Sequence, residues 1–291
     1  MAKEDGPLET AMLEVTLNKI GALLALGFGE AGSKIVAQNI KDGEEVNPML
    51  PGLKIMSIFG FCDIRNFTDA TEVLQEGVML FVNEIGEIVH GIVDKYSGAA
   101  NKNIGDAFLL VWKFEEGDQQ TDPETGELRV KECGRVSQLA DMSVLSFVLL
   151  IAALTRNRKM MKYNDHPGLN ERMPGYRVRL GLGLHLGYSI EGPIGSYYKI
   201  DASYLSPHVN MAMRLEGATK AFGVPLLIHQ ALHRHLTRRT RGWCRIIDWV
   251  VMAGNENPVK LYTVDVDPTQ LGYDKEQPKI SAKERKMQKI Q

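Results

Sequence analysis

The stretch I-M-S-I-F-G-F-C-D-I-R-N-F, residues 55–67, places a charged side chain at the end of an apolar segment. Its apolar residues predict a buried strand over Ile55–Cys62, and Asp63 follows that strand directly. A second carboxylate, Asp106, stands at the end of N-K-N-I-G-D, residues 101–106, after another strand-like run. The two aspartates become a candidate site if both strands belong to one sheet.

The rest of the chain alternates between helical and strand patterns. Between residues 178 and 186, leucine and valine alternate with arginine, glycine and histidine, which predicts a strand with one buried face. After the first strand we expect, in order, a helix over Val78–Tyr96, a hairpin of Ala99–Ile104 and Ala107–Phe114 turned at Gly105-Asp106, a loop over Gly117–Glu127, a helix over Val136–Arg156, a strand over Val178–Leu186, a helix near Val209–Thr219, and strands at Pro225–Ile228, Arg245–Val251 and Val259–Val264. This order predicts an α+β fold of ferredoxin-like type, an antiparallel sheet covered by helices.

Composition limits the classes of function. The 291 residues are 44% hydrophobic and 24% charged, as in an ordinary soluble globular protein. A net charge of -2 gives no basic footprint, so nucleic acid is not an expected partner. Three scattered cysteines favour a reducing compartment and a cytoplasmic location. The longest apolar stretch, Val144–Leu154, is shorter than the roughly 20 residues of a membrane span, and predicts a buried helix instead.

Three parts are expected along the chain. Residues 1–50 form an N-terminal helical segment, residues 51–268 the main domain, and residues 269–291 a flexible charged tail. In the first part, Leu13, Leu17, Ile20 and Leu24 follow the seam of a short coiled coil. Two heptads are too few to be self-sufficient, and an amphipathic helix packed on its own domain is an equal alternative. An upstream sensor, or a membrane segment that would make this chain the cytosolic part of a larger protein, is left open.

The position of Asp63 and Asp106 favours a metal site. If the first strand and the hairpin are neighbours, both carboxylates emerge side by side at one edge of the sheet. They would repel and raise each other's pKa unless a cation lay between them, and Mg²⁺ is the hard ion that carboxylates and substrate phosphates hold together. Singly, Asp63 is better explained as a capping residue and Asp106 as a turn residue, but jointly they favour the metal.

Three ordered motifs carry a resemblance to a known family. F-C-D-I-R-N-F-T (61–68), K-N-I-G-D-A-F (102–108) and V-N-M-A-M-R-L-E (209–216) resemble the motifs of the class III nucleotidyl cyclase catalytic domain, over about Leu53–Asp265. The resemblance implies synthesis of cyclic AMP or cyclic GMP. It also implies that Asp63 and Asp106, with the carbonyl of Ile64, hold two Mg²⁺ ions per site, for which Mn²⁺ can substitute.

The remaining parts of the motifs are assigned on the same basis. The resemblance implies that backbone amides of Asn66, Phe67 and Thr68 cradle the triphosphate, much as helix starts do elsewhere. Asn210 and Arg214 are four residues apart, so a helix presents both on one face. Family likeness gives Asn210 the ribose and Arg214 the charge that develops on phosphate oxygens.

Base preference is predicted from two positions. By its place in the second motif, Lys102 resembles the position that is Lys in adenylyl cyclases and Glu in guanylyl cyclases. Lysine only donates, which suits the acceptor N1 of adenine and favours ATP. The paired position, seven residues before Asn210, is Ser203, whose hydroxyl can accept from adenine or donate to guanine. We therefore expect an adenylyl cyclase and leave a guanylyl cyclase open.

The sequence also departs from the family pattern. The loop V-V-M-A-G-N, residues 250–255, lacks the lysine that usually grips the triphosphate, and Lys199 or Lys260 are the candidate replacements. This loss keeps open a non-catalytic regulatory domain that binds nucleotide. Asn66 replaces a common glycine, which is a mild change because asparagine tolerates left-handed backbone angles. A diguanylate cyclase is excluded because no G-G-D-E-F occurs.

The expected assembly is a homodimer. In the family, metal residues of one domain face base, ribose and arginine residues of another, in a head-to-tail pair. This chain holds both sets, so the resemblance implies a homodimer with two sites and ATP as substrate.

Overall fold

The computed structural model describes residues 10–23, 27, 32, 51–196, 198–252, 257–267 and 271. Its strands are β1 (Leu53–Ile64), β2 (Ala99–Ile104), β3 (Ala107–Lys113), β4 (Gln119–Thr121), β5 (Leu128–Val130), β6 (Leu180–Ser196), β7 (Lys199–Leu205), β8 (Leu226–His229), β9 (Cys244–Val250) and β10 (Val259–Val264). Its helices are α2 (Phe67–Leu74), η1 (Gln75–Gly77), α3 (Val78–Lys95), η2 (Glu116–Asp118), α4 (Gly134–Arg156), α5 (Arg158–Asn164), α6 (Pro167–Arg172), α7 (Pro207–Phe222), α8 (Gln230–His233) and α9 (Arg238–Arg241).

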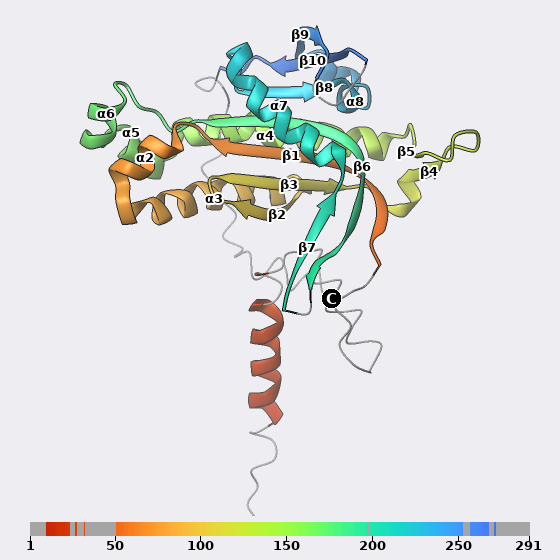
Figure 1. Ribbon diagram of the computed structural model, residues 1–291, viewed down its shortest axis with the longest axis horizontal. Coiled ribbons are helices and arrows are strands. Elements are labelled where there is room, and N and C mark those ends of the chain that lie inside the picture. Colours follow the sequence, from red (N-terminus) through yellow and green to blue (C-terminus); the bar gives the residue numbers. More distant parts are fainter. Residues whose placement is uncertain are drawn as a thin grey trace, which may run out of the picture.

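One eight-stranded sheet forms the centre of the fold (Figure 1). Its order is β2-β3-β1-β6-β8-β10-β9, with β7 paired to β6 as well. The strand pairs of this sheet are antiparallel except the parallel pair of β6 and β8. The expected α+β sheet with covering helices is therefore confirmed, and the predicted hairpin is the pair β2 and β3.

From Met56 onward strand β1 is buried on both faces, which explains why its apolar residues do not simply alternate with polar ones. Ile58 and Cys62 pack into the large core cluster with residues of α3 and α4. Phe59 and Phe61, which point the other way, pack with Tyr204 of β7 and with α7. Because strand side chains alternate between faces, a strand covered on both sides carries apolar residues on both faces.

The prediction of one buried face for residues 178–186 is wrong. Strand β6 runs from Leu180 to Ser196, and its first eight residues are all buried. Three of its glycines, Gly181, Gly183 and Gly187, lie beneath α7, where a Cβ added to Gly183 would come 2.3 Å from the carbonyl oxygen of Ala212. Glycine therefore alternates with leucine because a helix backbone rests on that face, and not because the face is solvated.

Helix α4 contains the apolar stretch Val144–Leu154 and is a core helix. By length and composition it could cross a membrane, but 56% of its most apolar window is buried inside the fold. Phe147 of α4 is fully buried and meets Trp112 of β3 edge to face, with ring centroids 5.8 Å apart. The prediction of a buried helix is confirmed.

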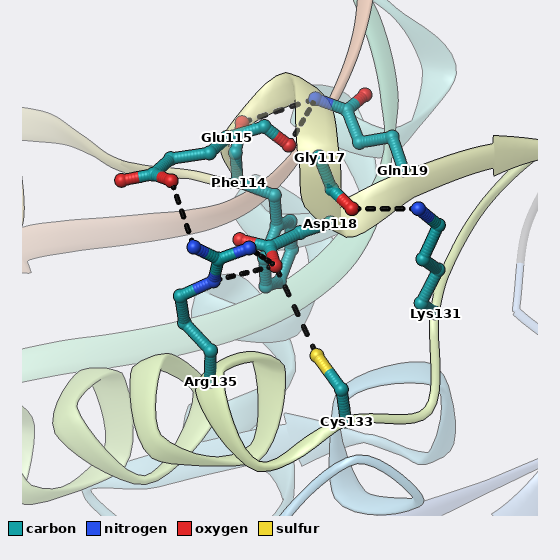
Figure 2. Close-up of polar contacts among 8 residues, drawn as sticks. All are labelled: Phe114, Glu115, Gly117, Asp118, Gln119, Lys131, Cys133 and Arg135. Carbon is teal, nitrogen blue, oxygen red and sulfur yellow. Dashed lines mark hydrogen bonds and ion pairs between the residues drawn. The ribbon is translucent and has the colours of Figure 1, made fainter.

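The loop expected over Gly117–Glu127 is in part a small hairpin, β4 paired with β5. Figure 2 shows what anchors it: the buried carboxylate of Asp118 accepts a hydrogen bond of 2.7 Å from Nε of Arg135 at the start of α4. Lys131 donates to the carbonyl of Gly117 over 2.7 Å, and Gln119 donates to the carbonyl of Phe114 over 3.0 Å. These contacts join residues up to 17 positions apart, so a local turn-rich composition did not reveal them.

Residues 10–23 form a helix that stands away from the sheet (Figure 1, red). Every residue in this helix is exposed, including Leu13, Leu17 and Ile20 of the predicted seam. The alternative of an amphipathic helix packed on its own domain is therefore wrong for these residues. Leu24 lies outside the described residues, as do most of residues 24–50 and all but Leu271 of residues 269–291.

Candidate active site

Asp63 and Asp106 meet at one end of the sheet. Asp63 is the last but one residue of β1 and lies opposite Ala107, the first residue of β3. The amide of Ile64 donates to the carbonyl oxygen of Asp106 over 3.2 Å. Gly105, with a φ of 64°, makes the turn that brings Asp106 to this position. The pairing of β1 with β3 therefore places the two carboxylates next to each other.

The electrostatics of Asp63 reflect this closeness. Partial burial raises the pKa of Asp63, and the negative charge of Asp106 raises it further. The positive charges of Lys220 and Arg65 act in the opposite direction, and lower it. A carboxyl group whose pKa is raised by a neighbouring carboxylate is an arrangement that a bound cation relieves.

These donors fit a divalent cation. Within the described part of the chain, no group of three or more His, Cys, Asp or Glu side chains is arranged to hold a metal. Mg²⁺ does not need such a group, because it commonly keeps several waters and takes one or two carboxylates together with substrate phosphates. Asp63, Asp106 and a backbone carbonyl such as that of Ile64 match that requirement.

The three residues expected at the triphosphate open helix α2. Asn66 is its N-cap and has left-handed backbone angles, φ 56° and ψ 35°, as its identity suggested. The N-cap side chain makes no capping hydrogen bond, and Phe67 and Thr68 begin the first turn. Amides of a first turn have no acceptor within their own helix, so they are available to an anion.

Helix α7 presents Asn210 and Arg214 on its outer face. Ser206 caps it by accepting from the amide of His208 over 3.0 Å, and Pro207 occupies its first turn. Asn210 and Arg214 are both exposed, whereas Ala212 and Leu215 are fully buried on the face toward β6. The two exposed residues therefore share a face that points away from the sheet.

The two residues predicted to read the base, Lys102 and Ser203, lie on β2 and β7. Nζ of Lys102 lies 2.6 Å from Oδ2 of Asp201, in a partly exposed ion pair. The side chain of Asn101 donates to the carbonyl of Ala202 over 3.5 Å, which holds the same two strands together. Ser203, two residues beyond Asp201 on β7, is buried.

The sequence did not predict Asp201 as the ion-pair partner of Lys102. Its one available signal was its position two residues before Ser203, which places both on one face of a strand. Because β7 was not predicted, that signal could not be used.

The two candidate replacements for the missing lysine, Lys199 and Lys260, lie on β7 and β10. Lys260 lies on β10, which β6 and β8 separate from β1, and its Nζ lies 5.3 Å from the ring centre of Trp249. Lys199 begins β7 and is exposed. Residues 253–256 of the loop itself lie outside the described residues.

Comparison with known proteins identifies the domain. Residues 54–262 match the family described as the adenylate and guanylate cyclase catalytic domain, and residues 1–41 match one described as the RasGEFs all helical domain. The chain is 26% identical over 273 residues to an adenylate cyclase of Anabaena cylindrica, covering 90% of this chain and 48% of that protein. It is also 26% identical over 216 residues to a terminal-differentiation specific adenylate cyclase of Dictyostelium discoideum, covering 72% of this chain and 9% of that protein. The chain thus spans about half or less of the length of these relatives.

Solved structures share the fold. A bacterial light-regulated adenylyl cyclase superposes with a TM-score of 0.64 at 20% identity, covering 94% of this chain and 68% of that one. An adenylyl cyclase of P. aeruginosa superposes with a TM-score of 0.58 at 21% identity, covering 77% of this chain and 100% of that one. A guanylate cyclase domain from Catenaria anguillulae in complex with GTP superposes with a TM-score of 0.52 at 18% identity, covering 74% of this chain and 98% of that one. With a family match that spans most of the chain, on a fold that these structures share, the protein belongs to the class III adenylate and guanylate cyclase catalytic domain family.

Proposed function

We propose that this domain is an adenylyl cyclase that converts ATP into 3',5'-cyclic AMP and pyrophosphate. The observation that carries the proposal is the juxtaposition of Asp63 and Asp106 at the end of β1 and β3, in a chain of the cyclase family. In the reaction, the 3'-hydroxyl of ATP attacks the α-phosphorus in line, the bond to the β-phosphate oxygen breaks, and the hydroxyl proton is lost. No covalent bond to the protein forms.

Each part of the site has a role in this reaction. Asp63, Asp106 and the carbonyl of Ile64 would hold two Mg²⁺ ions, or Mn²⁺ in their place. When bound, such ions supply Lewis acidity to the attacking hydroxyl and to the departing phosphate oxygens. The amides of Asn66, Phe67 and Thr68 receive the triphosphate at the start of α2.

The outward face of α7 supports a head-to-tail homodimer. Asn210 and Arg214 point away from the sheet that carries Asp63 of the same chain. A second copy in the opposite direction would bring its own α7 to the first chain's aspartates, with Asn210 on the ribose and Arg214 on the developing phosphate charge. Each dimer would then hold two equivalent sites.

The ion pair of Lys102 and Asp201 favours ATP. Adenine presents an acceptor at N1 and a donor at its amino group. Lys102 supplies a donor, and Asp201, held beside it, supplies an acceptor. Guanine presents the reverse pattern at these two positions, a hydrogen on N1 and a carbonyl oxygen. A guanylyl cyclase remains the second candidate because the hydroxyl of Ser203 can donate to that oxygen.

The deciding assay compares MgATP with MgGTP, and each metal in turn. We expect cyclic AMP to be the main product, and a loss of at least about 100-fold in kcat for Asp63→Asn and Asp106→Asn. The matched control is Asp248→Asn, which removes an exposed carboxylate on β9 and should retain activity. Substantial turnover by either aspartate variant would refute the metal assignment.

Two further outcomes separate the alternatives. Lys102→Glu should lower kcat/KM for ATP by more than tenfold, because it places an acceptor opposite adenine N1. Faster turnover of GTP than ATP by the unaltered protein would identify a guanylyl cyclase. Clear nucleotide binding without product, under both Mg²⁺ and Mn²⁺, would identify a regulatory domain. A cytoplasmic location and an upstream sensor or membrane segment belong to the same proposal, and fractionation of cells producing the native protein tests the first.

A further inference from the structure

An ion pair joins the metal-binding end of β1 to helix α7. Arg65 follows Ile64 directly, and its Nη1 lies 2.9 Å from Oε1 of Glu216. The side chains are 17% and 7% exposed. The same guanidinium donates to the hydroxyl of Thr219, and to the carbonyl oxygen of Glu216 over 3.4 Å. Arg65 belongs to the segment Asp63–Thr68, here called the metal loop. Its side chain thus contacts Glu216 and Thr219 of α7, which are 151 and 154 residues away in sequence.

The sheet is shaped to receive this pair. Gly181 of β6 lies opposite Asp63 in the strand register. A Cβ on Gly181 would come 1.8 Å from Nη2 of Arg65 and 2.1 Å from Oε1 of Glu216. The missing side chain therefore leaves the space in which the ion pair lies, next to one of the metal-site aspartates.

The surroundings explain why the pair has to stay together. Burial raises the pKa of Glu216, and the nearby charges of Asp63 and Asp106 raise it too, whereas Arg65 and, to a smaller degree, Lys220 lower it. A buried carboxylate so near two others would be costly without Arg65, since removing one partner of a buried ion pair leaves an uncompensated charge. Breaking the pair should therefore move α7 and the metal loop relative to each other.

Glu216 and the catalytic face of α7 lie on different sides of the same helix. Glu216 faces β6 and is buried, while Asn210 and Arg214 are exposed. In the head-to-tail dimer of the proposed function, on which this inference rests, the metal loop of one chain serves one site and its α7 serves the other.

We propose that Arg65 and Glu216 are positioning residues, which lock the metal loop to α7 and so couple the two active sites of the dimer. Neither needs to touch the nucleotide. The alternative for Arg65 is direct contact with the triphosphate, since it immediately precedes the 66–68 segment. The two roles, positioning and direct triphosphate contact, differ in which active site of the dimer loses activity when Arg65 is replaced.

Mixed dimers separate these roles. One chain carries Asp63→Asn and the other Arg214→Ala, so that a single intact site combines the α7 of the first chain with the aspartates of the second. Arg65→Gln is then placed in either chain. Positioning predicts a fall in kcat of about tenfold or more in both placements, with KM for ATP changed less than about threefold. Direct phosphate contact predicts a loss only when the change is in the second chain, and that result would overturn the proposal.

A readout without catalysis tests the pair itself. Arg65→Gln and Glu216→Gln should each lower the melting temperature by several degrees, and the double variant should lose less than the sum. Gly181→Ala should resemble the single variants, because its methyl group displaces the guanidinium. Arg129→Gln, which breaks the two surface ion pairs of Arg129 on β5 with Asp122 and Glu127, is the control and should leave the melting temperature within about 1 °C. Additive melting losses would show that the two residues do not act together.

The two proposals can fail separately. If the unaltered protein makes no cyclic nucleotide, the proposed function fails, whereas the melting cycle still reports whether the pair is coupled. If the unaltered protein is active but the mixed dimer without Arg65→Gln has no intact site, the head-to-tail arrangement is wrong, and the coupling of sites fails with it.

Discussion

Replacing Gly183 by alanine should lift helix α7 from the sheet. The added Cβ would lie 2.3 Å from the carbonyl oxygen of Ala212 and 2.6 Å from the amide nitrogen of Glu216. An ordinary contact begins at 3.4 Å, so the helix has to move by about 1 Å at this point. Both nearest atoms belong to the backbone, and no side-chain rotation can relieve the contact.

The magnitude follows from this displacement. Overpacking of a close-packed region typically costs about 1–3 kcal/mol of folding free energy. For a domain of this size that corresponds to a fall in melting temperature of roughly 2–10 °C. Asn210 and Arg214 move with α7, and a misplacement of about 1 Å in a catalytic constellation lowers the rate by about 100-fold. We therefore expect a loss of kcat that is much larger than the loss of stability alone would cause.

The assay measures urea unfolding, melting temperature and kcat on the same preparations. The matched control is Gly91→Ala in α3, where a Cβ meets nothing within 4 Å and the helix should gain about 0.5–1 kcal/mol. If Gly183→Ala unfolds within about 0.5 kcal/mol of the unaltered protein and turns over normally, then α7 does not rest on β6 as described, and the reasoning is refuted.

Three other predictions concern stability. Burial and, second, the charges of His208 and Arg234 lower the pKa of His229 to about 4, so the folded state favours its neutral form. The free energy of unfolding should therefore be highest above pH 6.5 and fall by up to about 3 kcal/mol as the pH drops toward 4. If urea unfolding of the unaltered protein shows no greater pH dependence than that of His229→Gln, this prediction is contradicted. Asp141→Ala removes the carboxylate that accepts hydrogen bonds from the amide and the hydroxyl of Thr237, the N-cap of α9, at 2.9 and 2.5 Å. The free energy of unfolding should fall by about 1–3 kcal/mol in chemical unfolding. An unchanged value would mean that α9 does not depend on this contact. Phe147→Ala should cost about 3–5 kcal/mol because the ring is fully buried against Trp112, and a loss below 1 kcal/mol would show a loosely packed core.

Much of the fold could be predicted because its elements have clear periods. The strand at Val259–Val264 is β10 with the same bounds, and the helix expected over Val136–Arg156 is α4, two residues longer at its start. The tight turn at Gly105-Asp106 identified the hairpin of β2 and β3. The prediction failed at Leu180–Leu186, where glycine next to leucine resembled a half-solvated strand. Glycine lacks a side chain in either case, and only the helix above it distinguishes the two.

Part of the candidate site was also within reach of the sequence. Asp63 and Asp106 could be brought together by argument, since Asp63 lies at the end of β1, Asp106 directly precedes β3, and those strands had to be neighbours. Asp201 could not, because β7 carries no strong strand pattern and its partner Lys102 is about 100 residues earlier. The ion pair of Arg65 and Glu216 was not predicted either, because 151 positions along the chain separate the two residues.

By itself, the sequence determined most of the longer elements, the family and the types of residue that the chemistry requires, because periodicity and motif spacing are local properties of the chain. Tertiary structure alone decided which side chains become partners and which way each face points. Arg65 lies on Glu216, and Asn210 points away from Asp63, because β6 pairs with β1 and α7 rests on its glycines. Ion pairs and close packing depend on distances of a few ångströms in space, and separation along the chain does not encode those distances.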